Sequence, residues 1–322
     1  MEPAKVSVII PVRNQENHLD ACIRSVSGQT LKEIEIIVVE GGSNDKSPEI
    51  ICEHMDSDPR IQLLNKAGEG LPLARQAGLK AATGKYIYHL DGDDILEPQA
   101  LELLYNRAED TDADMVVLNF WIENEYNKTK NKSQSICFVR YSGIDFIRSL
   151  YLRQNYWMVW SVFHKRALYE NFEIRFSAEL FLGEDTLLTS QLAYYSKKVV
   201  KLDSQPLLHH FIRKAPEEKR LSFSEKHYFD LHAYPQLVRD FLKDKPEYHM
   251  LEESVDCLRL QSIARSFQYQ CFGSAREMSR EALNILRRHP SLNRMMGARM
   301  KRIFRAYSVS EGLGKLVSKL FL

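Results

Sequence analysis

Three aspartates, Asp91, Asp93 and Asp94, end an apolar run in the segment KYIYHLDGDDILEP (85–98). Carboxylates this close repel one another unless water solvates them or they share a cation. Because residues two apart in an extended loop point the same way, Asp91 and Asp93 can face one ligand. Oxygen ligands select Mg²⁺ or Mn²⁺, and Mg²⁺ completes its shell with water and substrate phosphates. The spacing favours a metal clamp for a nucleotide diphosphate; the alternative is a polar turn in which Asp94 caps the next helix.

A second pair of acids, Glu184 and Asp185, lies in the segment FLGEDTLLTSQL (181–192). A neighbouring like charge raises the pKa of a carboxyl group toward the range in which it can act as a general base. The pair also precedes an apolar helical stretch beginning at Leu187, so it suits the N-terminal cap of a helix. Both roles are compatible, because the start of a helix would hold a base rigidly.

The elements that must position these acids alternate between strand and helix. VSVIIPV (6–12) and IEIIVVE (34–40) are β-branched runs without alternation, which is typical of strands buried on both faces of a parallel sheet. Further strands are expected at 60–65, 85–90 and 114–120, and helices at 16–30, 48–54, 73–82 and 98–109. This order predicts an α/β fold with a Rossmann-like, mostly parallel sheet flanked by helices.

Polar segments follow several of these strands at the ends where doubly wound sheets bind their ligands. Arg13 and Asn14 come after the first strand, and Glu40 to Ser43 come at the end of the second. Asp91 to Asp94 come after the fourth. We expect the three segments to meet at one edge of the sheet.

The composition indicates a catalytic domain and a helical tail. The chain has 322 residues and a formal net charge of +1, which gives no reason to expect nucleic acid as a partner. Five scattered cysteines, the strand pattern at the N-terminus and the absence of a long apolar window favour a cytoplasmic location. From about Ser224 the sequence suits helix, so we expect a domain at 1–222 and a helical C-terminal region at 223–322.

Four motifs in order resemble the family-2 glycosyltransferases, which have a glycosyltransferase-A fold. The resemblance runs from Val6 to about Ser222 and is carried by SVIIPVRNQENHLDACIRSVSGQT, IIVVEGGSNDKS, GLPLARQAGLKAATGKYIYHLDGDD and FLGEDTLLTSQL. It implies an inverting transferase that uses Mn²⁺ or Mg²⁺ and a nucleotide-activated sugar, a UDP-sugar above all. The implied acceptor is a hydroxyl of a growing bacterial surface glycan or of a lipid-linked precursor.

The resemblance also implies roles for single residues. Asp185 matches the catalytic base, beside Glu184, and Asp93 matches the metal ligand, with Asp91 on the ribose or uridine side. Glu40 stands where the family has the aspartate that hydrogen-bonds uracil. The implied nucleotide-binding residues are Pro11, Arg13, Asn14, Glu40, Gly42, Ser43, Arg75, Asp91 and Gly92.

Three further residues have two interpretations each. His210 suits a metal ligand that joins Asp91 and Asp93, or a paired histidine beside a strand. Trp157 and Trp160 suit an acceptor-binding platform for a sugar ring, or the hydrophobic core.

The end of the chain is basic. Between Arg287 and Leu322 lie nine Lys or Arg and one acid, and GLGKLVSKLFL (312–322) has apolar residues at helical spacing. Such a helix favours peripheral contact with the anionic inner face of the plasma membrane. The alternative is that its apolar face packs on the catalytic domain or on a second copy of the chain, which would form a homo-oligomer.

Two other functions compete with sugar transfer. A nucleotidyltransferase would need a glycine-rich, basic phosphate loop after the first strand, where this chain has PVRNQEN (11–17). A non-catalytic subunit that binds a sugar nucleotide is the second alternative, against which Asp91, Asp93 and Asp185 argue.

Overall fold

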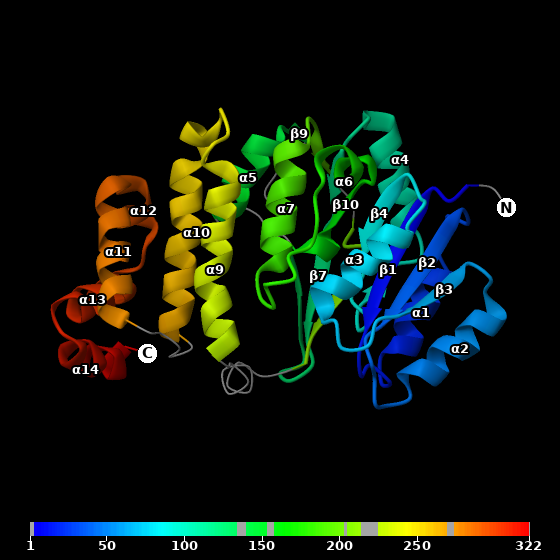
Figure 1. Cartoon of the computed structure of the whole chain (residues 1–322), viewed down its shortest axis with the longest axis horizontal. Coiled ribbons are helices and arrows are strands. Elements are labelled where there is room, and N and C mark those ends of the chain that lie inside the picture. Colours follow the sequence, from blue (N-terminus) through cyan, green and yellow to red (C-terminus); the bar gives the residue numbers. More distant parts are fainter. Residues whose placement is uncertain are drawn as a thin grey trace. The chain divides into compact units, whose positions relative to one another are not determined.

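The structure, a computed structural model, describes residues 3–133, 140–152, 158–202, 205–213, 225–268 and 274–321. The chain divides into two compact units, Met1–Ala215 and Pro216–Leu322 (Figure 1). The boundary expected between residues 222 and 223 falls within 214–224, outside the described residues.

The first unit is built on an eight-stranded sheet with the order β3-β2-β1-β4-β10-β6-β11-β9. Its strands are β1 (Val6–Val12), β2 (Ile34–Glu40), β3 (Ile61–Asn65), β4 (Tyr86–His89), β6 (Met115–Val117), β9 (Arg140–Tyr141), β10 (Val162–Lys165) and β11 (Val199–Lys201). Neighbours from β3 to β4 are parallel, as are β6 and β11. β10 is antiparallel to β4 and β6, and β9 is antiparallel to β11. The expected mostly parallel sheet is confirmed.

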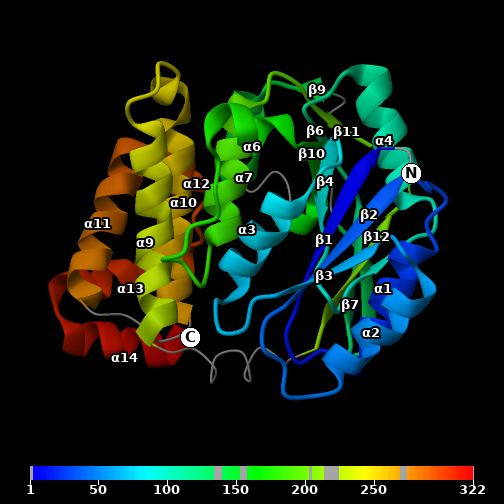
Figure 2. The same ribbon diagram turned by 45° about the vertical axis from the view of Figure 1, so that its right-hand side comes forward.

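Helices on both faces of this sheet bury every residue of β1 and β2. In Figure 2, α1 (Leu19–Ser27) and α2 (Ser47–Ser57) lie to one side of β1–β3, and α3 (Leu71–Ala81) lies to the other. α3 approaches closely because Gly78 has no side chain; a Cβ there would lie 2.4 Å from Ile9 Cγ2. Further helical segments of this unit are α4 (Ala100–Thr111), α5 (Gly143–Tyr151), the 3₁₀ turn Val159–Ser161, α6 (Ala167–Phe172) and α7 (Glu184–Tyr195).

A buried polar cluster ties the start of β1 to β2 and to the chain that follows α3. Ser7 Oγ donates to Glu35 Oε1 over 2.5 Å and accepts a hydrogen bond from the Gly84 backbone N–H over 2.8 Å. Glu35 Oε1 also accepts from the Thr83 backbone N–H at 2.6 Å. Because Glu35 is buried, these donors replace the water that its carboxylate would otherwise bind.

A second, four-stranded sheet with the order β5-β12-β7-β8 completes the first unit. Its strands are β5 (Ile95–Leu96), β12 (Leu208–Ile212), β7 (Phe120–Asn124) and β8 (Thr129–Lys132). The single strand expected at 114–120 is wrong, because β6 ends at Val117 in the large sheet and β7 begins at Phe120 in the small one. Leu118 and Asn119, which lie between them, pair instead with Ser161 and Leu207 through backbone hydrogen bonds of 3.2 Å and 2.8 Å.

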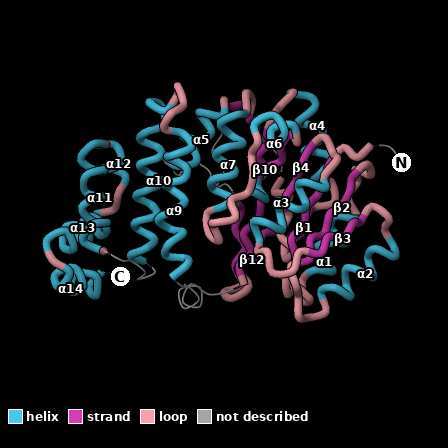
Figure 3. Tube along the Cα trace, in the orientation of Figure 1, coloured by secondary structure: helices cyan, strands magenta, loops and turns pink. Residues whose placement is uncertain are grey.

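The described part of the second unit consists of helices (Figure 3). They are α9 (Glu225–Leu242), α10 (Tyr248–Gln268), α11 (Ala275–Arg288), α12 (Pro290–Met295), α13 (Ala298–Val309) and α14 (Glu311–Phe321). Asp256 of α10 is fully buried and binds Arg239, Arg288 and His289, the last over 2.8 Å. This charge-paired acid therefore joins three helical segments, and the expected helical C-terminus is confirmed.

Candidate active site

The acidic loop after β4 is anchored by its last member. Asp94 is fully buried, and its Oδ2 lies 3.0 Å from His210 Nδ1. The Phe211 backbone N–H donates to Asp94 Oδ1 over 3.1 Å. The alternative in which Asp94 caps the next helix is wrong, because Gln99 is the N-cap residue of α4 and makes no side-chain cap bond. Asp94 instead joins the loop to β12.

Arg75 brings together acids from separate parts of the sequence. Its side chain is only 3% exposed; Nη2 donates to Asp91 Oδ1 over 2.7 Å, and Nη1 donates to Glu184 Oε1 over 2.9 Å. One guanidinium thus connects α3, the end of β4 and the first turn of α7. Asp91 and Glu184, which is next to Asp185, therefore lie on either side of one guanidinium.

The acids on α7 lie in its first turn. The N-cap residue is Gly183, with φ of 85°, and the cap has no side-chain hydrogen bond. Neither acid is therefore the cap residue, although the positive end of the helix dipole stabilises the ionised form of each. Burial and the neighbouring Asp185 raise the pKa of Glu184 to about 8, against which Arg75 acts. Burial also raises the pKa of Asp185.

Asp93 has one carboxylate oxygen engaged. Arg213 Nη1 donates to Asp93 Oδ2 over 2.7 Å, and Arg213 Nη2 donates to the Asp93 carbonyl, also over 2.7 Å. Among the described residues, Asp93 Oδ1 has no hydrogen-bond partner. Burial and the charge of Asp91 raise the pKa of Asp93. A cation at this oxygen would relieve both effects, since it stabilises the ionised carboxylate.

The charges of the cluster leave room for such a cation. Five acids (Asp91, Asp93, Asp94, Glu184 and Asp185) face three basic groups (Arg75, Arg213 and His210). Within the described ranges, no three acidic, histidine or cysteine side chains converge into a complete metal site. Mg²⁺ usually takes one or two carboxylates and completes its shell with water and phosphate oxygens, so this donor set fits a metal that arrives with a nucleotide.

His210 has its partner inside the protein. Although burial opposes it, the hydrogen bond and charge of Asp94 raise the pKa of His210. Asp94 occupies Nδ1, and a carboxylate partner on one ring nitrogen is also the arrangement of metal-ligating histidines, which bind through the other nitrogen. The ring also stacks on Trp160 at 4.5 Å between centroids. The pairing with Asp94 fits both interpretations of His210.

The loops after β1 and β2 meet as the sequence predicts. Both carboxylate oxygens of Glu40 accept backbone hydrogen bonds, from Gly42 over 2.9 Å and from Ser43 over 2.5 Å. Although burial acts in the other direction, these bonds lower the pKa of Glu40. Ser43 Oγ accepts from the Asn14 backbone N–H over 2.9 Å, which joins the two loops beside the exposed Arg13.

The acidic loop approaches the same place. A Cβ on Gly92 would lie 3.1 Å from the Pro11 carbonyl oxygen, so only a residue without a side chain fits there without displacement. Beneath the loop, the buried Cys22 Sγ lies 3.5 Å from the Asp91 carbonyl. The three polar segments therefore share one edge of the sheet.

The tryptophan predictions have different outcomes. Trp160 is 6% exposed, and its indole meets the Phe120 ring edge-on at 4.7 Å. It belongs to the hydrophobic core, so its expected role as an acceptor platform is not supported, because a sugar needs an accessible ring face. Trp157 lies outside the described residues.

With the site in place, the family model described as Glycosyl transferase family 2 matches residues 7–172, more than half of the chain. The chain belongs to glycosyltransferase family 2. Two similar relatives of this family member are the Uncharacterized glycosyltransferase EpsJ of Bacillus subtilis and Glycosyltransferase GlyA of Streptococcus pneumoniae. EpsJ is 30% identical over 62% of this chain, and GlyA is 33% identical over 62%. The matches span 58% of EpsJ and 29% of GlyA.

The fold of this family member is similar to that of TarS from S. aureus. A crystal structure of TarS superposes with a TM-score of 0.70 at 16% identity, covering 98% of this chain and 55% of that chain. TarS residues 1–349 in complex with UDP-GlcNAc superpose with a TM-score of 0.68, covering 98% of this chain and 90% of that chain. The glycosyltransferase-A fold is thereby shown.

Sequence reasoning missed the roles of Asp94 and of the Ser7–Glu35 cluster. For Asp94 the alternation of an extended loop gives no signal, because Gly92 and Asp93 form a turn in which the Asp94 N–H donates to the Asp91 carbonyl over 3.0 Å. Ser7 and Glu35 give no signal either. Each is a single polar residue inside an apolar run, and it is the apolar residues of that run that predict a strand.

Proposed function

We propose that this chain transfers a sugar from a UDP-sugar to a hydroxyl group of a growing surface glycan or a lipid-linked precursor, with inversion at the anomeric carbon. The contact that carries the proposal is the double ion pair of Arg75. It holds Asp91, expected at the nucleotide, and Glu184, next to the expected base Asp185, on one guanidinium. The residue expected to bind the donor and the residue next to the expected base then lie on the same side chain. The complex of TarS with UDP-GlcNAc supports a UDP-linked donor.

The transfer is one displacement. The acceptor oxygen attacks the anomeric carbon from the side opposite the diphosphate, the bond from that carbon to the phosphate oxygen breaks, and UDP leaves. Asp185 takes the proton of the attacking hydroxyl, which needs one carboxylate on the acceptor side. The negative charge on the leaving UDP needs stabilisation, which a divalent cation held by Asp93 would supply as a Lewis acid. Arg213, bound to Asp93, adds positive charge at the same place.

The nucleotide is assigned to the edge formed by the first two strand ends. Glu40 has both oxygens bound to its own turn, which fixes the direction of the remaining lone pairs before a base arrives. A carboxylate acceptor in this place suits the N–H of a uracil ring. Asn14 and Ser43 hold the two loops together, so the base and ribose would meet a rigid surface.

Asp93→Asn tests the metal-dependent part of this proposal. The amide keeps the size of the side chain but loses the charge, so we expect no detectable transfer and a loss of the Mn²⁺-dependent part of UDP binding, with an unchanged melting temperature. Calorimetry with UDP in the presence and absence of Mn²⁺, and UDP release from a panel of UDP-sugars, measure this. Near-normal turnover in Asp93→Asn would refute the metal clamp.

The same measurements separate the competing functions. A non-catalytic subunit would bind UDP and release none from any UDP-sugar. A nucleotidyltransferase would release pyrophosphate from a nucleoside triphosphate instead. Its phosphate loop is not supported here, because Asn14 after β1 is occupied in holding the turn after β2.

We also propose that the second unit carries a membrane-binding surface. On α13, Arg299, Arg302, Arg305 and Val309 are exposed at helical spacing, whereas Ile303 and Phe304 on the other face are buried. An exposed face that combines basic and apolar groups suits an anionic lipid surface at the inner face of the plasma membrane. The competing occupant is a second copy of the chain. Among the described residues, no helix is long and apolar enough to cross a bilayer.

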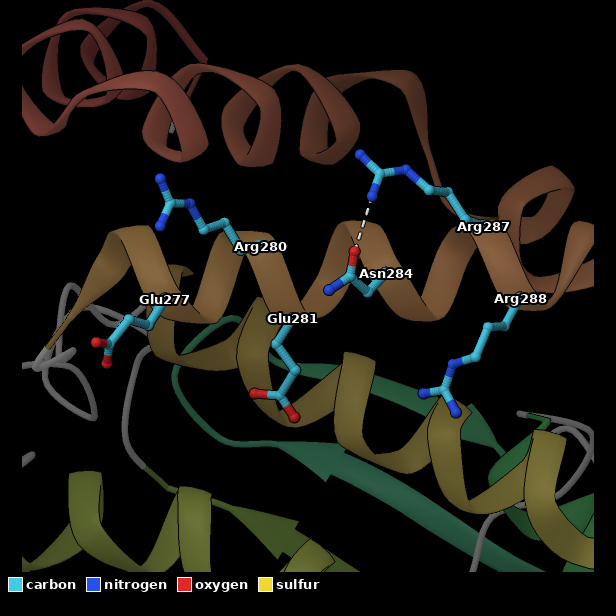
Figure 4. A pocket seen from close by; sticks show the side chains of 6 residues that line it. All are labelled: Glu277, Arg280, Glu281, Asn284, Arg287 and Arg288. Carbon is cyan, nitrogen blue, oxygen red and sulfur yellow. Dashed lines mark hydrogen bonds between the residues drawn. The ribbon is translucent and has the colours of Figure 1, made fainter.

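A hollow along α11, with a volume of about 750 Å³, extends the basic character of this unit. Figure 4 shows Arg280 and Arg287 directed to one side of the helix, and Glu281 and Arg288 directed to the other. Glu281 is paired with Arg259 at 2.7 Å and Arg288 with Asp256 at 3.0 Å, so these two have structural partners. Arg287 contacts Asn284 of its own helix, so its charge stays at the surface.

A further inference from the structure

The four-stranded sheet has one face in the core and one facing outward. Leu96, Phe120 and Leu208 point into the hydrophobic core and are at most 3% exposed. The register pairs His209 with both Ile95 and Trp121, and Phe211 with Glu123, so these side chains lie on the opposite face. We call this the outer face, defined by Ile95, Trp121, Glu123, Lys130, His209 and Phe211; all are partly or fully exposed.

Contacts run along the outer face from Trp121 to the candidate active site. Lys130 Nζ lies 4.8 Å from the centroid of the Trp121 ring and 2.7 Å from Glu123 Oε1. Glu123 in turn binds His209, whose ring lies 6.5 Å from that of Phe211.

The last contacts of this series reach the expected metal ligand, Asp93. The Arg213 guanidinium lies 4.9 Å from the centroid of the Phe211 ring and binds Asp93. The face is therefore continuous with the expected metal ligand. It follows β12, Leu208–Ile212, for about 13 Å at ~3.3 Å of rise per residue.

A hollow opens at the far end of the outer face, where β5 and β12 meet α4. Its volume is about 470 Å³, and it is lined by Trp121, Glu97, Gln99, Gln205, Pro98 and Pro206, among others. An aromatic ring, two proline rings and two amides combine apolar surface with polar groups of both hydrogen-bonding kinds. Sites of roughly 300–1,000 Å³ with this mixture take small organic ligands.

The charges of the outer face select the class of ligand. Acidic and basic side chains alternate along the outer face. Glu97 lies 2.8 Å from His209. Glu123 binds Lys130, and Asp93 binds Arg213. A surface of alternating sign has no field that would attract a polyanion or a polycation. It offers donors and acceptors in turn, as a chain of hydroxyl groups requires, and the aromatic rings suit the apolar faces of sugars.

We propose that the outer face and its hollow bind the acceptor glycan several sugar units behind the reacting hydroxyl. The assignment rests on the proposed sugar transfer for the identity of the ligand. Trp121 and Gln99 hold the distant sugars, and the chain runs along Phe211 toward the candidate active site, where its reacting hydroxyl meets Asp185. Affinity for the acceptor then depends on its length, and short acceptors do not reach the hollow.

The test is binding of the full chain to an array of neutral bacterial-surface oligosaccharides, from disaccharides to octasaccharides, with UDP calorimetry on the same samples. We expect wild-type binding to increase with glycan length, and Trp121→Ala to weaken binding of the long glycans about tenfold, as the loss of one ring contact of ~1.4 kcal/mol would do. UDP affinity should be unchanged. Gln99→Ala provides a second variant, because its exposed side chain makes no cap bond and its removal does not disturb α4.

The matched control is Phe229→Ala, since Phe229 is an exposed aromatic residue with Lys226 Nζ 5.3 Å from its ring centroid. It should bind the array as the wild type does. Equal binding by the wild type, Trp121→Ala and Gln99→Ala would overturn the proposal, as would an absence of length dependence or of any binding. If long glycans bind through Trp121 while no UDP-sugar is turned over, the subsite stands and the proposed transfer fails.

Discussion

At the scale of single residues, one arginine separates two carboxyl groups that would otherwise repel each other. Arg75 is buried between Asp91 and Glu184, and each carboxylate is held by one nitrogen of the same planar group. Removing one partner of a buried ion pair leaves an uncompensated charge, which costs far more than an exposed pair contributes. The acids of the site are therefore mutually dependent, and single substitutions must preserve size and hydrogen bonding to be informative.

Asp185→Asn is such a substitution and tests the base. The amide keeps the volume of the side chain but does not accept a proton, so we expect transfer to fall about 10²-fold or more while UDP affinity and melting temperature persist. A burial-raised pKa keeps the carboxyl protonated to higher pH. Wild-type transfer should accordingly decline as the pH falls through this raised pKa, and the variant should lose that dependence. Initial rates across a pH series measure both effects.

Glu184→Gln is the matched control for that measurement. Glu184 binds Arg75, so its loss should disturb the position of Asp91 and raise the KM for the donor rather than abolish the proton transfer. If Asp185→Asn keeps most of the activity and Glu184→Gln loses it, the two assignments must be exchanged.

At the scale of elements, the polar cluster at the start of β1 supports the sheet from the end away from the site. Ser7, Glu35 and the backbone of Thr83 and Gly84 satisfy one another without water. A Cβ on Gly84 would lie 2.6 Å from the Ser7 nitrogen, so the chain passes close to β1 here. The cluster fixes where α3 ends and β4 begins, and thereby the place of Arg75.

Glu35→Ala measures that support. The change leaves buried donors without an acceptor, so the free energy of unfolding should fall by about 1–3 kcal/mol. Glu33→Ala is the control, because its pair with Lys5 is partly exposed and should contribute less than about 1 kcal/mol. Chemical denaturation of both variants, followed by fluorescence, tests the difference. A loss in Glu35→Ala no larger than in Glu33→Ala would contradict the role given to the cluster.

The bounds of a strand or helix were predictable where a single sequence pattern was enough to define them. β1 and β2 have the expected bounds, because unbroken β-branched runs occur in strands covered on both faces. The break at Leu118 was not predictable, since MVVLNF (115–120) is apolar apart from Asn119 and the two strands differ only in which sheet accepts their hydrogen bonds. At the site, the positions of Asp91, Asp93, Glu40 and the Glu184–Asp185 pair followed from strand ends and resemblance. Their ion-pair partners depend on tertiary packing, which no local spacing reports.

At the scale of the whole molecule, the two units differ in architecture. The first has both sheets and the candidate active site, and the described part of the second is helical. Basic residues dominate the end of the chain, although the net charge of the whole chain is only +1. This asymmetry gives the second unit an electrostatic character that the first lacks.

The double variant Arg299→Gln/Arg305→Gln tests whether that character directs the protein to membranes. Each basic residue near an anionic bilayer contributes about 1 kcal/mol, so we expect binding to phosphatidylserine vesicles to weaken about thirtyfold. UDP release with a soluble acceptor should be unchanged. The control is Lys80→Gln/Lys128→Gln, which removes the same charge from exposed positions of the first unit. Equal losses in both double variants would indicate a general charge effect, and a change in oligomeric state with vesicle binding intact would favour a second copy of the chain.

The burial of Asp94 has a consequence for the thermodynamics of ligand binding. The loop that presents Asp91 and Asp93 is fixed from below, through the side chain of His210 and the backbone of Phe211. Ordering a loop costs about 1–2 kcal/mol per residue in conformational entropy. Here the loop is already ordered in the folded protein, so the entropy of ordering it does not oppose nucleotide binding. Preorganisation of this kind leaves the free energy of the phosphate and metal contacts available for affinity, with little entropic penalty from the loop itself.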